Sequence, residues 1–208
     1  QYEPLGLRIA NQTWDGRIME IEYIHGEPLS ERLAECAFQR DTRTFIAMFR
    51  RYVDLLRATG NLNFEMGSAF KSVFGNVKLP YGLKSACVTN IDLIPQNIIV
   101  TPKEEWVMID PEWTFDFPIP VDFVLYRAVF YLRDSHPDLR QTLTKAGIDL
   151  WTLGGIRAER SRYLRMEENF QSGTVGIHDH QTTDASAEPP RPTGFIARIK
   201  KSTLDLAM

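Results

Sequence analysis

Segment 89–110 constrains the fold of this 208-residue chain more than any other, because it joins apolar strand-like runs to polar groups at fixed positions. It reads TNIDLIPQNIIVTPKEEWVMID. The runs NIIVT and WVMID flank the polar turn PKEE, which is the pattern of a β-hairpin. The open ends of an antiparallel pair lie close together. The sequence therefore predicts that Asp92, Asn97 and Asp110 converge at one end of a hairpin spanning residues 97–110.

Asp92 and Asn97 have two interpretations at this stage. Both residue types favour turns, and Pro95 disfavours helical geometry at Ile94, so they could simply shape a turn. Alternatively, they face a metal ion or a substrate from a loop that feeds a buried strand. The rest of the chain is needed to choose between these interpretations.

The remaining sequence is mainly helical in pattern, which predicts an α+β fold dominated by helices. Segment 41–60 has the strongest helical period, with Asp41 or Thr42 at its start and Gly60 after its end. Its apolar stripe is Phe45, Phe49, Tyr52 and Leu56, and its arginines Arg50, Arg51 and Arg57 are expected to face solvent. We expect a short strand at 16–24, helices at 25–37, 119–134, 136–147 and 157–171, and an irregular loop with one short helix at 61–86.

Several single residues carry expectations of their own. Ser30 could help to cap the helix that follows residue 28. Arg127 lies within the apolar helix 119–134 and is interpreted as a buried, ion-paired residue, while Asp122 is interpreted as a charge at that helix's N-terminus. Trp106 is expected in the core.

Composition excludes several classes of function. The chain is 43% hydrophobic and 25% charged with a net charge of −3, as in a globular protein without the basic excess that suggests nucleic-acid binding. No apolar run approaches the roughly 20 residues of a membrane span, so no transmembrane segment is expected. Cys36 and Cys87 are interpreted as buried free thiols, which favours a reducing, cytoplasmic location. A chain that starts at Gln1 is expected to be a fragment.

The C-terminal part has a different composition. Residues 173–194 are polar and rich in Pro, Thr and Ser, which predicts a flexible linker. Residues 195–208 resume an apolar pattern and are expected to begin a further segment. The triplet His178-Asp179-His180 could serve as metal ligands, but its position in a polar linker argues against this.

The order of these elements resembles the C-terminal lobe of the protein-kinase-like fold, which includes the aminoglycoside phosphotransferases. Residues 90–97, NIDLIPQN, resemble the catalytic loop H-R-D-L-x-x-x-N, with Asp92, Leu93 and Asn97 matching. Asp110 stands where the metal-binding D-F-G motif would begin, and IDPEW resembles the I-D-F/W-E sequence of aminoglycoside and choline phosphotransferases. EIEYIHGEPL, residues 20–29, resembles the hinge that holds adenine through backbone groups.

The resemblance implies a site and two cofactors, ATP and Mg²⁺. Asp92 would orient the acceptor hydroxyl and accept its proton, and Asn97 and Asp110 would hold the magnesium ion. The hinge residues Glu22, Ile24 and Glu27 would contact the nucleotide. Glu112 is a further metal-site or orienting candidate, although an exposed glutamate after a proline is an equal alternative.

Departures from the kinase pattern narrow the expected substrate. Asn90 and Ile91 replace the His and Arg of the loop, and only about ten residues separate Asp110 from the next predicted helix, without an A-P-E sequence. This leaves no room for an activation loop or a protein-substrate platform, which favours a small-molecule or glycan hydroxyl. The N-terminal lobe is expected to be largely absent from this sequence, because neither G-x-G-x-x-G nor a V-A-I-K-type lysine occurs. Either that lobe lies upstream of Gln1, or it was lost and the module is inactive. Residues 1–24 are then a remnant of that lobe with the hinge strand, and residues 25–172 are the C-terminal lobe.

A closer resemblance is to kinase-like modules fused to methyltransferases or glycosyltransferases in bacterial surface-polysaccharide (O-antigen) assembly. It implies adjoining domains of those kinds in the same chain and a glycan acceptor. The sequence thus favours an ATP-dependent phosphotransferase module. The alternative is a catalytically inactive kinase-like scaffold or binding module in a multidomain glycan-assembly protein.

Overall fold

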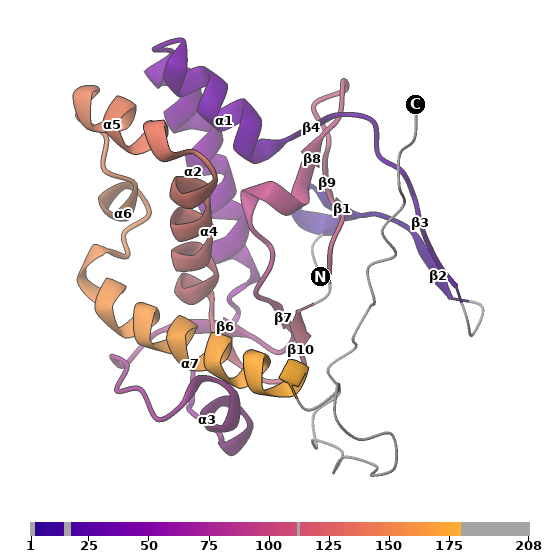
Figure 1. The fold of residues 1–208 in the computed structure, drawn as a ribbon, viewed down its shortest axis with the longest axis vertical. Coiled ribbons are helices and arrows are strands. Elements are labelled where there is room, and N and C mark those ends of the chain that lie inside the picture. The colour runs from indigo at the N-terminus through magenta and orange to yellow at the C-terminus, as the bar shows by residue number, and fades with distance from the viewer. Residues whose placement is uncertain (1–2, 15–17, 112, 180–208) are drawn as a thin grey trace.

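The computed structural model describes residues 3–14, 18–111 and 113–179. Its architecture is α+β and mainly helical, and it contains the short hairpin that the sequence predicted. In Figure 1 the helices gather on the left, and the sheet that contains the hairpin lies on the right.

Every predicted helix is present, with most ends shifted by a few residues and the end of the last helix by eight, from 171 to 179. The one that the sequence did not predict is a single turn, α6, whose four residues are too few to show a period. The helices are α1 (Leu29–Phe38), α2 (Thr42–Thr59), α3 (Ser68–Phe74), α4 (Val121–Ser135), α5 (Pro137–Lys145), α6 (Leu150–Leu153) and α7 (Arg160–Asp179), with 3-10 turns η1 (Glu3–Leu5), η2 (Pro95–Asn97) and η3 (Arg157–Glu159).

Helix α2 forms as its pattern predicted. The Asp41 side chain accepts a hydrogen bond from the Thr44 backbone N–H and so caps the helix, and Gly60 is the C-terminal cap. The whole apolar stripe is buried, namely Phe45, Phe49, Tyr52 and Leu56.

The predicted hairpin is the centre of a four-stranded sheet in the order β1-β9-β8-β4. Its two strands pair in antiparallel register, with Ile98 opposite Met108. The sequence did not predict β1, which pairs in parallel with β9 and buries Leu7 completely. The strands of this sheet are β1 (Leu7–Ile9), β4 (Glu27–Pro28), β8 (Ile98–Val100) and β9 (Trp106–Met108).

The other described strands are two or three residues long and form three small sheets, in the orders β2-β3, β10-β7 and β11-β6-β5. The strand expected at 16–24 is confined to β3, which pairs with β2 in a separate hairpin. Region 61–86 contains the expected short helix, α3, together with two short strands. These strands are β2 (Gln12–Trp14), β3 (Met19–Ile21), β5 (Leu62–Asn63), β6 (Lys84–Ala86), β7 (Thr89–Asn90), β10 (Thr114–Phe115) and β11 (Ile119–Pro120).

Aromatic rings pack α3 against α4, α7 and β10. The Phe74 ring of α3 lies 5.8 Å from Phe115, 5.3 Å from Phe123 and 5.8 Å from Phe170, measured between ring centroids. These partners belong to β10, α4 and α7. Phe74 is fully buried, so it joins three distant segments in one core.

The α2 arginines are exposed as expected, but two of them have specific contacts. The Arg51 guanidinium lies 4.1 Å from the ring centroid of Trp106, which is buried as predicted. Arg57 donates a 2.7 Å hydrogen bond to the Gly154 carbonyl oxygen. Surface position in an amphipathic helix does not reveal such partners.

Two smaller expectations are wrong. Ser30 is buried inside the first turn of α1, whose N-cap is Pro28 without a side-chain hydrogen bond. Both thiols are free, but Cys87 is exposed and Cys36 is half-buried, so neither is a core thiol. Burial raises the pKa of Cys36 and keeps that group protonated at neutral pH.

Helix α7 continues to Asp179, beyond Ser172 where the sequence predicted its end. The first residues of the expected linker 173–194 therefore belong to this helix, while its remainder, His180 and segment 195–208 lie outside the described residues. Within the described part of the chain, no helix combines the length and apolar character required to cross a membrane.

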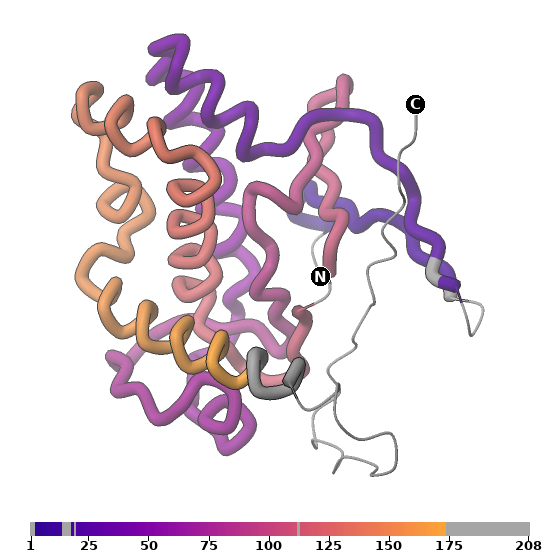
Figure 2. The backbone as a smooth tube through the Cα atoms, viewed as in Figure 1, coloured from indigo at the N-terminus to yellow at the C-terminus, as the bar shows by residue number. Residues whose placement is uncertain are grey.

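The approach of residue 26 to β8 provides a test of the fold. Figure 2 follows the chain from β3 past the hairpin to α1. Gly26 has φ +154°, and an added Cβ would lie 2.3 Å from the Val100 carbonyl oxygen, so Gly26→Ala must displace backbone. Gly82→Ala is the control, because Gly82 also has positive φ but open space around it. We expect the control to lose about 1–2 kcal/mol of unfolding free energy and Gly26→Ala distinctly more. Equal losses in urea titrations would contradict this close approach.

Candidate active site

Backbone pairing brings the Asp92 loop and the segment after Asp110 together. Strand β7 immediately precedes the loop, and β10 follows Asp110; the two pair antiparallel with Asn90 opposite Thr114. The Ile91 N–H extends this contact by donating a 3.0 Å hydrogen bond to the Trp113 carbonyl. The segment that follows Asp110 therefore lies beside the Asp92 loop, which precedes the hairpin.

Asn97 is hydrogen-bonded both to the Asp92 loop and to the residue before Asp110. Its carbonyl accepts a 3.0 Å hydrogen bond from the N–H of Ile109, the residue before Asp110. Its side-chain Nδ2 donates a 3.0 Å hydrogen bond to the Asp92 carbonyl. The structure thus gathers Asp92, Asn97 and Asp110 at one end of the hairpin, while their chemical roles remain predictions.

The side-chain oxygens at this end are suited to a hard cation. Because Asn97 Nδ2 faces a carbonyl, the amide orientation is fixed and Oδ1 is left as an acceptor. Asp110 is half-buried, and its carboxylate has no hydrogen bond or ion pair to any residue that the structure describes. Oxygen donors of these two kinds fit Mg²⁺, which keeps several waters and needs only one or two protein ligands.

Larger metal clusters are not seen in the described part of the chain, where no three His, Cys, Asp or Glu side chains gather. Glu112, the further candidate, lies outside the described residues. The residues therefore fit a sparsely ligated magnesium ion better than a closed structural metal site.

Arg127 of α4 is hydrogen-bonded to the Asp92 loop. Its Nη2 donates to Asp92 Oδ1 at 2.7 Å, and its Nε donates to the Ile91 carbonyl at 3.0 Å. Its Nη1 contacts both Glu167 oxygens, at 2.7 and 2.5 Å. Arg127 and Glu167 are only 3% and 4% exposed, so the predicted buried ion pair is confirmed and extends to α7. Tyr131 adds a hydroxyl donor to Glu167 at 2.8 Å.

This cluster sets the protonation of its members. Burial raises the pKa of Asp92; Arg127 offsets part of that effect, and the nearby Asp110 and Glu167 carboxylates add to it. Burial alone would lower the pKa of Arg127, but Glu167 and Asp92 together raise it, so the guanidinium stays charged. Asp92 is consequently a stronger base than an ordinary aspartate.

Two supporting residues had no recognisable role in the sequence. Asn90, which stands where the kinase loop has His, accepts a 2.6 Å hydrogen bond from the Asp92 N–H and so shapes the turn. Tyr52 of α2 donates a buried 2.7 Å hydrogen bond to the Leu93 carbonyl. Sequence reasoning assigned Tyr52 to the apolar stripe, because its ring is core and only its hydroxyl reaches the loop.

The three hinge candidates differ in whether their polar groups remain available to bind a nucleotide. The Glu22 carboxylate is held by Arg8 at 2.7 and 3.1 Å and by Asn11, and its N–H donates to the Asn11 carbonyl. Ile24 is half-buried, and its backbone groups have no hydrogen-bond partner among the described residues. Glu27 is exposed on β4, opposite Val100 of β8. Of the three, Ile24 has backbone groups left for a ligand.

Comparison with known proteins gives a structural likeness without a sequence match. No family model and no curated protein matches the sequence. A similar solved structure is that of the choline kinase LicA from Streptococcus pneumoniae, with 15% identity, 88% coverage of this chain, 70% coverage of that chain and a TM-score of 0.43. At that identity and score, the likeness decides neither fold family nor function.

The Arg127 ion pairs provide one test. Arg127→Met leaves two carboxylates, Asp92 and Glu167, without their cation in a buried place, and should lower the unfolding free energy by about 3–5 kcal/mol. Arg32→Met is the matched control, since its ion pair with Glu104 is largely exposed, and should cost under about 1 kcal/mol. The Arg127→Met/Glu167→Met double variant should recover part of the loss; additive losses would refute the coupling.

The raised pKa of Asp92 provides a second test. Its charge costs stability above the raised pKa, and this cost disappears when the group is protonated in both states, below its usual value of 3.8. As the pH rises through the raised pKa, wild type should therefore lose stability relative to Asp92→Asn, in addition to the pH-independent cost to the variant of losing a charged partner of Arg127. Asp116→Asn, at an exposed position, should change stability by less than about 0.5 kcal/mol. A stability difference between Asp92→Asn and wild type that is the same at acidic and neutral pH would contradict the assignment.

Proposed function

We propose that this chain is a kinase-like phosphotransferase module that transfers a phosphoryl group from ATP to the hydroxyl of a small molecule or glycan. The observation that carries the proposal is the hydrogen-bonded junction at the hairpin end. It unites one basic carboxylate, Asp92, with two oxygen-bearing side chains, Asn97 and Asp110, in the chain order of a kinase catalytic loop.

Asp92 is suited to the acceptor side of the reaction. Its Oδ1 is held by Arg127, while Oδ2 has no hydrogen-bond partner within the described residues. Oδ2 can therefore receive a hydrogen bond from an acceptor hydroxyl and take its proton as the phosphoryl group moves. The raised pKa strengthens this base, and Arg127 fixes its orientation.

Asn97 and Asp110 are suited to the phosphate side. They would hold Mg²⁺, which when bound neutralises charge on the phosphate oxygens. The cluster contains three carboxylates (Asp92, Asp110 and Glu167) but one guanidinium, Arg127, which leaves two negative charges uncompensated. A divalent cation balances that excess and removes the repulsion between Asp92 and the incoming phosphates.

The nucleotide base would lie along residues 22–27. The unbonded backbone groups of Ile24 can pair with adenine, because an exposed peptide N–H and C=O match its edge. The Arg8–Glu22 ion pair fixes the strand just before this position, and Glu27 would approach the ribose. Here Glu22 acts as a support for the hinge.

The acceptor is proposed to be small or a glycan. Between Asp110 and α4 the described chain forms only β10 and β11, with no further element on which a protein substrate could dock. Participation in surface-polysaccharide assembly, and adjoining methyltransferase or glycosyltransferase domains, follow from the sequence resemblance alone. Use of ATP together with two free thiols fits a cytoplasmic location.

One observation favours a second candidate function. Neither a lysine nor a glycine-rich turn occurs in residues 3–14 and 18–24, where the strands next to the hinge lie. Kinase-like enzymes use such groups on the nucleotide phosphates. A non-catalytic module that binds a glycan or a partner domain is therefore the alternative, and it predicts no magnesium-dependent nucleotide binding.

The decisive experiment compares three conservative variants. Calorimetry should show ATP binding that requires Mg²⁺, and Asp110→Asn should weaken it because a cation ligand loses its charge. Asp92→Asn should leave binding nearly unchanged but slow transfer to sugar and small-alcohol acceptors by about 10²- to 10⁴-fold. Asp116→Asn, exposed and outside the site, should match wild type in both assays.

The possible failures point to different errors. Absence of nucleotide binding at millimolar ATP would reject the enzyme and favour the non-catalytic module. Binding that is unaffected by Asp110→Asn would reject the metal assignment. Transfer at the wild-type rate by Asp92→Asn would reject the assignment of the base.

A further inference from the structure

A second site lies apart from the Asp92 loop. A cavity of about 420 Å³ is enclosed by the end of α4, by α5 and α6, and by the start of α7. In Figure 1, α5 and α6 lie at the left edge, on the other side of the helical layer from the β8–β9 hairpin. Its polar lining is mostly arginine, namely Arg133, Arg140, Arg157 and Arg160, with Asp149 and Thr144.

The cavity carries a local positive charge in a chain that is acidic as a whole. Four arginines and one aspartate give its lining a charge of +3, against −3 for the chain. The Asp149 carboxylate is already engaged by Arg157 at 3.0 Å and by the Thr152 hydroxyl at 2.7 Å. Within the described residues, Arg133, Arg140 and Arg160 form no ion pair with any carboxylate.

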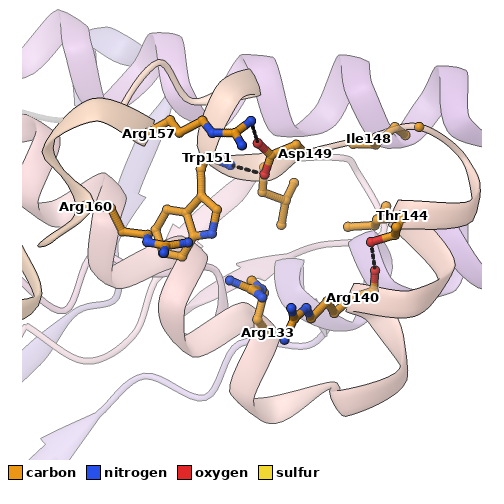
Figure 3. Close-up of a pocket in the computed structure, with 11 residues that line it drawn as sticks. Arg133, Arg140, Thr144, Ile148, Asp149, Trp151, Arg157 and Arg160 are labelled. Carbon is orange, nitrogen blue, oxygen red and sulfur yellow. Dashed lines mark hydrogen bonds and ion pairs between the residues drawn. The ribbon is translucent and has the colours of Figure 1, made fainter.

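These three arginines converge from different helices, as Figure 3 shows. The guanidinium carbons of Arg133 and Arg160 lie 5.5 and 5.6 Å from the centroid of the buried Trp151 ring. Burial and the charges of Arg140 and Arg160 lower the pKa of Arg133. The indole thus holds two guanidinium groups in place although their charges repel each other.

The position of Arg160 adds an independent argument. It is the first residue of α7, where a cation opposes the helix dipole, and the first turn of this helix contains no acidic residue. The preceding residue, Glu159 of η3, is paired with Arg162. Arg133, by contrast, lies in the last turn of α4, where a cation is favourable. Helix stability therefore accounts for Arg133 but not for Arg160, which would gain from an external anion.

We propose that this cavity binds a diphosphate-like group. Three unpaired guanidinium groups provide paired N–H donors for phosphate oxygens, and a multiply charged anion relieves their mutual repulsion. Because Trp151 pre-positions two of them, little side-chain entropy is lost on binding. The volume suits a small molecule, and the phosphates can belong either to a soluble compound or to a lipid headgroup.

Calorimetry with pyrophosphate in EDTA tests the proposal, because without magnesium the acidic Asp92–Asp110 region repels the probe. Wild-type protein should bind, and Arg140→Gln and Arg160→Gln, both at exposed side chains, should each weaken binding about tenfold or more. Arg43→Gln, at an exposed arginine of α2, is the matched control and should bind as wild type does. Circular dichroism verifies that each variant is folded.

Sedimentation with phosphatidylcholine vesicles, with and without phosphatidic acid, distinguishes the two sources. Pyrophosphate binding without sedimentation on phosphatidic-acid vesicles indicates a soluble ligand, and sedimentation that needs both phosphatidic acid and Arg140 indicates a headgroup. Failure to bind either probe overturns the proposal. Equal loss of pyrophosphate binding in Arg43→Gln, or none in Arg140→Gln and Arg160→Gln, also overturns it.

Discussion

The candidate site depends on one buried guanidinium. Arg127 of α4 binds the Ile91 carbonyl and the Asp92 carboxylate of the loop, and Glu167 of α7. A group this deeply buried is stable only when charged partners satisfy it, so the loop, α4 and α7 must assemble together. The rest of the helical layer provides the low-dielectric surroundings that make these contacts strong and make Asp92 basic.

Much of the frame could be predicted from the sequence, because it depends on local patterns. The period of α2, its Asp41 cap, the hairpin and a paired Arg127 inside an apolar helix all follow from neighbouring residues. The convergence of Asp92, Asn97 and Asp110 could also be expected, because hairpin geometry converts a spacing in sequence into proximity in space.

The partners that complete these features are remote in sequence, and so could not be predicted. Strand β1 has three residues and gains its stability from parallel pairing with β9. Glu167 lies 40 positions beyond Arg127 and resembles any surface glutamate of a helix. The arginine cavity likewise arises from four segments whose charges are ordinary when each is viewed alone. The exposure of Cys87 could not be predicted for a different reason: cysteine is usually a buried residue type, and this position is an exception.

The β7–β10 pairing has a consequence for how this protein could evolve. The separation between the two carboxylate-bearing segments is set by backbone hydrogen bonds, such as that from Ile91 to Trp113, and these do not depend on side-chain identity. Substitutions of exposed or half-buried side chains along and beside β7 and β10 can therefore change stability while leaving the spacing of Asp92 and Asp110 intact. As long as the core around Arg127 and Phe74 still forms, side-chain identity along these strands can vary, which allows sequences of this architecture to diverge around a constant constellation.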